Sequence, residues 1–225
     1  MSGHLEDLRD RLLEAALAHV VFDGWTDAAL RRAARDAGLK PDAVRFAFPG
    51  GGRDLLDWFA RRGDAQLAAA LAQDRGPRAN GERLRVRDAI ARAVRLRLEA
   101  MSAHREAVRR GLALLALPHN LPRAATQIYH TVDTIWAGLG DRSADFNFYS
   151  KRALLAGVYL TTLLYWLGDE SDDFVDSWDF LDRRIADVMT IQKLRGQTDK
   201  ATAGFPSALR LLSFLRYPGR PRFHI

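Results

Sequence analysis

The sequence predicts an all-α protein. Apolar residues recur at spacings of three and four along most of the 225-residue chain, which is the period of an amphipathic helix. The alternation of polar and apolar residues that is typical of half-buried strands is absent from the sequence. Turn-forming clusters divide the chain into about nine helices. These clusters fall at residues 22–25, 38–41, 49–52, 76–81, 118–122, 138–145 and 168–172.

The same pattern predicts four consecutive parts. We expect a helix-turn-helix-like module over residues 1–72 and a larger helical bundle over residues 73–195. The segment GQTDKATAG (196–204) is small and polar, which is typical of a flexible linker. After it, FPSALRLLSFLRY (205–217) predicts one more, amphipathic helix.

Composition excludes some kinds of site and leaves the partner open. The chain has no cysteine, so it can form neither disulfides nor thiolate metal sites. Its formal charge of +6 would attract nucleic acid or an anionic membrane. However, 30 Arg against 4 Lys, with abundant Ala, is the bias that a GC-rich genome produces. The charge by itself therefore identifies no partner.

No segment predicts secretion or a membrane span. The first 22 residues have an amphipathic pattern with acidic residues mixed in, unlike a signal peptide. The longest apolar run, Ala153 to Leu167, is too short to cross a bilayer and fits a buried helix. We therefore expect a cytoplasmic protein that is soluble or peripherally bound to a membrane.

The segment WTDAALRRAARDAGLKPDAVRFAFPGG, Trp25 to Gly51, has the pattern of a helix-turn-helix. Thr26 is suited to cap the first helix, and Gly38 to take the left-handed conformation of the tight turn. The aromatic residues and FPGG at the end resemble the end of the recognition helix in TetR-family repressors, which implies a TetR-like fold. The residues expected to bury between these helices are Leu30, Ala33, Ala37, Leu39 and Val44.

The segment matches the helix-turn-helix fold better than it matches the side chains that DNA recognition requires. Base edges are read by exposed side chains near the start of a recognition helix, usually Arg, Asn, Gln, Ser or Thr. Here that region is Lys40–Ala43, where Asp42 would face the phosphates with a like charge. We therefore do not expect DNA binding. The alternative is a TetR-type regulator with a hydrophobic ligand, in which Lys40, Arg45 and Arg53 would contact DNA and binding would depend steeply on salt.

Enzyme motifs are missing from the sequence. The six histidines have no metal-ligand spacing, and no Glu-x-x-His pair predicts a di-iron site. FPGGGRD lacks the Lys-Ser/Thr of a phosphate-binding loop. The carboxylates of Asp169, Glu170, Asp172 and Asp173 favour a solvated loop over an acid–base pair. We expect no catalytic residue, metal or cofactor.

The basic segment from Arg75 to Arg110 holds eleven Arg against four acidic residues. It could line a surface for phosphates of nucleic acid or lipid. The simpler interpretation is a solvated helix face with exchanging ion pairs.

Two motifs near the C-terminal end carry a family resemblance. They are GDRSADFN (140–147), followed by an aromatic pair, and WDFLDRRIADVM (178–189); FDGWT (22–26) and AFPGG (47–51) accompany them. With these motifs, the chain resembles the Coq-nine family of lipid-binding accessory proteins of ubiquinone biosynthesis, which also have a TetR-like fold. The resemblance covers residues 22–194.

The resemblance implies a function without catalysis. Family members bind isoprenoid or quinone-like lipids between the last helices of the bundle. They assist the demethoxyubiquinone hydroxylase of the Coq-seven type, and they attach to membrane through a C-terminal amphipathic helix. We therefore expect a homodimer, bound peripherally to the inner membrane, that presents a lipid to this hydroxylase.

The expected lipid contacts lie in ALLAGVYLTTLLYWLG and WDFLDRRIADVM. A stripe at this spacing is also typical of a core or of the dimer seam of TetR-like folds, so the alternatives stay open. The predicted lipid-binding residues are Leu155, Val158, Tyr159, Thr162, Trp166, Trp178, Leu181, Ile185 and Val188.

The partner-facing patch implied by the resemblance lies in DFNFYSKR. Phe148 and Tyr149 point about 100° apart on a helix, so at least one of them can be exposed for a partner; otherwise both are core. The predicted partner-binding residues are Asp145, Asn147, Phe148, Tyr149 and Arg152.

The pattern of residues 205–217 predicts weak attachment to an anionic membrane. Its apolar side is broad, and arginines at the edge can snorkel to lipid headgroups. The alternative is docking on the bundle or on the dimer partner. The predicted membrane-binding residues are Phe205, Leu209, Leu211, Leu212, Leu215 and Arg216.

Overall fold

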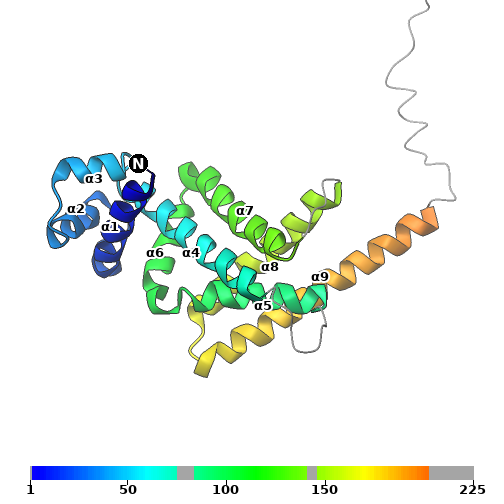
Figure 1. The fold of residues 1–225 in the computed structure, drawn as a ribbon. Helices are drawn as coiled ribbons and strands as arrows, with labels where there is room; N and C mark the ends of the chain where they lie inside the picture. The colour runs from blue at the N-terminus through cyan, green and yellow to red at the C-terminus, as the bar shows by residue number, and fades with distance from the viewer. Residues whose placement is uncertain (1, 75–83, 141–145, 203–225) are drawn as a thin grey trace, which may run out of the picture. The chain divides into compact units, whose positions relative to one another are not determined.

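The computed structural model describes residues 2–74, 84–140 and 146–202. Over these residues the chain is built from helices with no strand, so the all-α prediction is confirmed (Figure 1). Three short 3-10 turns join some of the longer helices. The helices are α1 (Ser2–Asp23), α2 (Asp27–Asp36), α3 (Pro41–Ala47), α4 (Gly52–Asp74), α5 (Val86–Glu99), α6 (Arg105–Leu115), α7 (Leu121–Gly138), α8 (Phe146–Gly168) and α9 (Val175–Thr202).

The chain forms two compact units, Met1–Asp182 and Arg183–Ile225. The boundary predicted between residues 72 and 73 falls within α4, inside the first unit. The linker predicted over 196–204 is helical as far as Thr202, because α9 continues through it. One glycine in a helix costs only about 1 kcal/mol, and no proline lies there to end α9. The predicted tail helix, 205–217, lies outside the described residues.

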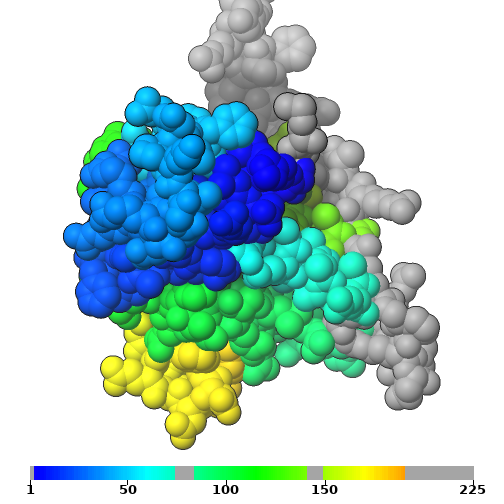
Figure 2. Space-filling view, turned by 60° about the vertical axis from the view of Figure 1, so that its left-hand side comes forward, coloured from blue at the N-terminus to red at the C-terminus, as the bar shows by residue number. Residues whose placement is uncertain are grey.

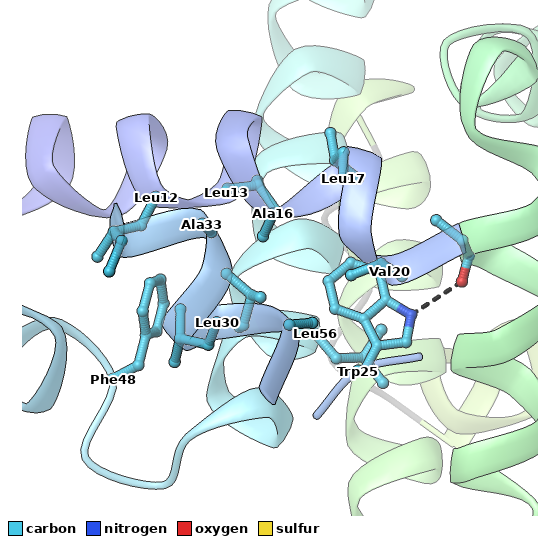
Figure 3. Close-up of a cluster of buried hydrophobic side chains, with 14 of the residues drawn as sticks. Leu12, Leu13, Ala16, Leu17, Val20, Trp25, Leu30, Ala33, Phe48 and Leu56 are labelled. Carbon is cyan, nitrogen blue, oxygen red and sulfur yellow. Dashed lines mark hydrogen bonds between the residues drawn. The ribbon is translucent and has the colours of Figure 1, made fainter. Parts of the chain in front are cut away.

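The helix-turn-helix module forms as its sequence predicts. The Thr26 side chain accepts a hydrogen bond from the Ala29 amide at 3.2 Å and so caps α2. Gly38 has a φ of +65°, which allows the tight turn into α3. Leu30 and Ala33 are buried, while Ala37, Leu39 and Val44 are half-buried. Leu12, Leu13, Ala16 and Val20 of α1 lie in one buried cluster with Leu30 and Ala33, as Figure 3 shows.

Trp25 joins the module to the bundle. Its ring is buried, and its indole N–H donates to the backbone oxygen of Ala107 on α6 at 2.9 Å (Figure 3). The Trp25 ring also packs against Phe59 of α4, with ring centroids 5.2 Å apart. The surface of α1–α3 is accordingly continuous with that of α4 and α6 (Figure 2).

The FPGG motif makes the turn between α3 and α4. Gly51 has a φ of +67°, a conformation that side chains rarely adopt. The amide of Gly52 donates to the Asp27 carboxylate at 2.9 Å, and a Cβ at Gly52 would collide with the Trp25 carbonyl group. The glycines are therefore explained by the turn and by its contact with the start of α2.

The turn between α8 and α9 differs from the predicted solvated loop at Asp169. This side chain is 5% exposed, and its two carboxylate oxygens accept hydrogen bonds from the amides and hydroxyls of Ser171 and Ser177. The neighbouring Glu170, Asp172 and Asp173 are exposed, as expected. The Asp169 carboxylate accepts a hydrogen bond from the Ser177 amide near the start of α9, an amide that has no partner within the helix, and this accounts for the burial of Asp169.

No helix of the described part of the chain is long and apolar enough to cross a bilayer.

Candidate functional site

An apolar pocket lies between five helices of the first unit. It has a volume of about 470 Å³ and is lined by side chains from α4, α5, α6, α7 and α8, together with Met101 after α5. This volume falls within the range of roughly 300–1,000 Å³ that is usual for small-molecule sites. Since most of the lining is Leu, Ala, Ile, Val, Met or Phe, the pocket is suited to an apolar ligand.

The pocket has an apolar rim. Leu121 at the start of α7 and Leu164 near the end of α8 both line it, yet they are 54% and 56% exposed. Ala116 and Ala125 line the pocket and are also exposed. These four residues therefore mark the mouth, where the pocket meets the surface.

A buried polar cluster forms one part of the wall. We call it the Arg97 cluster, and it comprises Arg97 of α5, Asp64 of α4, Thr131 of α7 and Tyr159 of α8. Arg97 is 3% exposed; its Nε donates to Asp64 Oδ1 at 3.0 Å, and its Nη2 donates to the Ala60 carbonyl at 3.2 Å. The Thr131 hydroxyl donates to the same Asp64 oxygen at 2.8 Å. Arg97, Thr131 and Tyr159 line the pocket.

Burial controls the titration of this cluster. Desolvation raises the pKa of the Asp64 carboxyl, although the Arg97 guanidinium and the Thr131 hydroxyl act in the opposite direction. Burial likewise raises the pKa of the Tyr159 phenol above its usual value of 10.0, further from neutral pH. The cluster thus presents hydrogen-bonding groups in an environment that contains little water.

The predicted lipid-binding residues are divided between the pocket and the packed interior. Tyr159 lines the pocket. Six others are buried but do not line it, and they are Leu155, Val158, Thr162, Trp166, Trp178 and Leu181. Ile185 and Val188 belong to the second unit. The face of α8 that lines the pocket carries Tyr159, Leu160, Leu163 and Leu164.

The larger part of the lining was not among the predicted residues. α6 contributes Val108, Leu112 and Leu115, and α7 contributes Ile128 and Ala124. A signal for α7 was present, because Leu121, Ala124, Ile128 and Thr131 recur at helical spacing. That spacing indicates a buried face without indicating that the face borders a cavity.

The predicted partner-binding patch is partly exposed. The Tyr149 side chain is 70% exposed near the start of α8. Arg152 is buried, and its guanidinium donates to Asp133 of α7 at 2.9 and 2.6 Å. Arg152 therefore joins α8 to α7. Asp145 and the side chains of Asn147 and Phe148 lie outside the described residues.

The exposed face of α3 is poor in DNA-reading groups. Lys40, Asp42 and Arg45 are exposed, as a recognition helix requires. Phe46, however, is also 68% exposed, and an exposed aromatic ring does not take the place of a hydrogen-bonding side chain in base readout. In the part of the chain that the structure describes, no group of three or more His, Asp or Glu side chains could hold a metal ion.

Comparisons with known proteins agree with this fold and with the sequence motifs. Residues 121–192 match the family model named COQ9. The chain is 34% identical over 91% of its length to the bovine protein named "Ubiquinone biosynthesis protein COQ9, mitochondrial", and 35% identical over 89% to the Drosophila melanogaster protein of that name. It spans 63% and 61% of the lengths of these two relatives.

The fold resembles a solved TetR transcriptional regulator from Nitrosomonas europaea. The TM-score is 0.63 at 19% identity, over 80% of this chain and 97% of the regulator. The prediction of a TetR-like fold is therefore confirmed.

Proposed function

Because this chain is a relative of the COQ9 proteins along most of its length, we propose that it acts in ubiquinone biosynthesis as a lipid-binding accessory protein without catalytic activity. It binds an isoprenoid quinone precursor and presents it to a membrane-associated demethoxyubiquinone hydroxylase. The observation that carries this proposal is the apolar pocket of about 470 Å³ between α4, α5, α6, α7 and α8.

The pocket suits a prenylated ring for a simple physical reason. Each methylene group removed from water stabilises the complex by about 0.8 kcal/mol, and the pocket walls are almost entirely apolar. A long polyprenyl chain exceeds the pocket, so part of it must leave through the mouth at Leu121 and Leu164. There the exposed leucines provide apolar contacts for the chain.

A tryptophan at the mouth tests this assignment. Ala125 is exposed and lines the pocket, so Ala125→Trp can occupy the mouth without displacing buried side chains. We expect the variant to retain at most one-tenth of the isoprenoid lipid that copurifies with the wild type. The measurement is organic extraction of the purified protein followed by mass spectrometry.

Ala113→Trp is the matched control. Ala113 is exposed on α6 and does not line the pocket, so this variant should retain lipid as the wild type does. Equal retention by wild type, Ala125→Trp and Ala113→Trp would place the lipid elsewhere. Absence of isoprenoid lipid from all three would contradict the proposed function.

The hydroxylase contact is proposed to include Tyr149. Because its side chain is 70% exposed, Tyr149→Ala should weaken hydroxylase pulldown severalfold and change the melting temperature by no more than about 2 °C, as for a substitution worth up to ~0.5 kcal/mol at the surface. Tyr129→Ala, at another exposed tyrosine, serves as control. Unchanged pulldown, or a large loss of stability, would remove Tyr149 from the contact.

Membrane attachment is proposed to depend on Phe205–Tyr217. In the helix that the sequence predicts for this segment, four leucines and Phe205 would share the apolar side, and Arg210 and Arg216 could contact anionic headgroups. We expect Leu212→Glu to float with anionic vesicles less than the wild type, because it places a charge on that side. Flotation equal to that of the wild type would exclude this role.

The inner membrane is the proposed location; the bovine relative is named mitochondrial.

The fold and family also support a homodimer as part of this proposal, since TetR-like proteins pair through their last helices. The alternative of a DNA-binding regulator is not favoured, because Asp42 and Phe46 occupy the exposed face of α3.

A further inference from the structure

The Arg97 cluster is an unusual component of an apolar pocket. A buried Arg–Asp pair contributes little net stability, because desolvation offsets the attraction between the charges. In other proteins, replacing a buried ion pair by apolar side chains of similar size is often neutral or stabilising. The presence of this pair in the pocket wall therefore calls for an explanation other than packing.

One donor of Arg97 has no protein partner. Nε and Nη2 are satisfied by Asp64 and the Ala60 carbonyl, whereas Nη1 is buried without a hydrogen bond. Leaving a buried polar group without a partner is costly, and such groups are rare in proteins. The Nη1 atom is covered and lies beside Gly63 of α4, so the guanidinium must turn to bring it to an oxygen in the pocket. Such an oxygen would give it the missing acceptor.

The position of the Arg97 cluster determines which end of an amphipathic ligand lies deep in the pocket. The rim is apolar and exposed at Leu121 and Leu164, while Arg97, Thr131 and Tyr159 are buried in the wall. An amphipathic ligand gains most when its oxygen-bearing head lies against the buried polar groups and its chain runs to the rim. The reverse orientation would leave the guanidinium against hydrocarbon.

The ion pair in the Arg97 cluster favours a neutral head group over an anionic one. Arg97 already has the Asp64 carboxyl at 3.0 Å as a counterion. A fatty-acid carboxylate would bring a second negative charge into the same buried space, and like charges in a low-dielectric site repel strongly. A neutral carbonyl or phenol oxygen accepts a hydrogen bond without this cost.

We propose that the Arg97 cluster binds the neutral, oxygen-bearing ring of a quinone- or phenol-type lipid, with the ring inside the pocket and the chain toward the rim. This inference rests on the proposed function and extends it to the residues that hold the head group and to the orientation of the lipid. Arg97 supplies the principal donor, and the hydroxyls of Thr131 and Tyr159 add further polar contacts.

Three probes with ten-carbon chains separate the head from the chain. They are decylubiquinone, which has a neutral quinone head, decylbenzene, which has no oxygen, and decanoate, which is anionic. Calorimetric titration in dilute detergent gives their dissociation constants for the full chain. We expect the wild type to bind decylubiquinone about tenfold or more tightly than decylbenzene or decanoate.

The double variant Arg97→Met/Asp64→Leu replaces the ion pair by apolar side chains of similar size. It should bind decylbenzene at least as well as the wild type and lose the preference for the quinone. The matched control is Arg152→Met/Asp133→Leu, which replaces another Arg–Asp pair between helices, where neither residue lines the pocket. This control should keep the preference. If the first double variant does not fold, Tyr159→Phe removes one hydroxyl alone and should reduce the preference severalfold.

The outcomes distinguish the two proposals. If the wild type binds none of the probes, the proposed lipid-binding function fails. If it binds decylubiquinone and decylbenzene equally, or if the preference survives in both Arg97→Met/Asp64→Leu and Tyr159→Phe, the pocket holds lipid but the cluster does not recognise its head. Tighter binding of decanoate than of decylubiquinone would contradict the proposal that the head group is neutral.

Discussion

Trp25→Ala is expected to lower the free energy of unfolding by about 3–5 kcal/mol, the usual cost of removing a buried tryptophan. The Trp25 side chain is 4% exposed and contacts Phe59 of α4, and its indole donates to Ala107 of α6. Its loss therefore opens a cavity where the module meets the bundle and removes a hydrogen bond between them. Urea unfolding followed by circular dichroism measures the change.

Two further substitutions of aromatic residues separate the loss of ring packing from the loss of the hydrogen bond. Trp25→Phe keeps part of the ring packing and loses the hydrogen bond to Ala107, so a smaller cost of roughly 1–2 kcal/mol is expected. Phe22→Ala, three residues earlier, removes a ring that is 79% exposed and should cost no more than about 0.5 kcal/mol. Equal effects of Trp25→Ala and Phe22→Ala would contradict the role given to Trp25.

The local features of the fold were predictable from the sequence because they depend on neighbouring residues. Thr26 caps the helix that begins with the next residue, and Gly38 makes a turn three residues before α3. The stripe of α1 also lies within one helix. Such features require no knowledge of how distant segments pack.

The pocket could not be located in the same way. α8 is apolar on several sides, so Leu155 and Val158 gave as strong a signal as Leu160 and Leu163, although only the second pair borders the pocket. A cavity exists where helices fail to fill the space between them, and this depends on the packing of all its walls.

The burial of Arg97 could not be predicted from the sequence either. Arg97 lies within the basic segment from Arg75 to Arg110, whose pattern favours a solvated helix face, yet it is buried. Its counterion, Asp64, lies 33 residues earlier, on another helix. Nothing in the local sequence distinguishes Arg97 from the exposed Arg92 and Arg95 on the same helix.

Asp169→Ala is expected to lower the free energy of unfolding by roughly 2–4 kcal/mol, because hydrogen bonds to a charged group are worth about 1.5–3 kcal/mol each and are not additive. The variant leaves the buried Ser177 amide and hydroxyl without an acceptor. It also frees Ser171 at the start of the turn into α9. Asp172→Ala, at an exposed neighbour, is the control and should cost no more than about 0.5 kcal/mol.

The pH dependence of this difference tests the charge of Asp169. Burial alone would raise its pKa, but the hydrogen bonds from Ser171 and Ser177 outweigh burial and lower the pKa to about 2. A carboxyl with a lowered pKa in the folded state stabilises the fold above its unfolded value of 3.8, and this contribution is lost as the pH falls toward 2. The gap in unfolding free energy between wild type and Asp169→Ala should therefore be constant from pH 7 to pH 5 and shrink below pH 4. A gap that does not change with pH would mean that Asp169 acts through packing alone, and the ionised carboxylate would then not be what holds the start of α9.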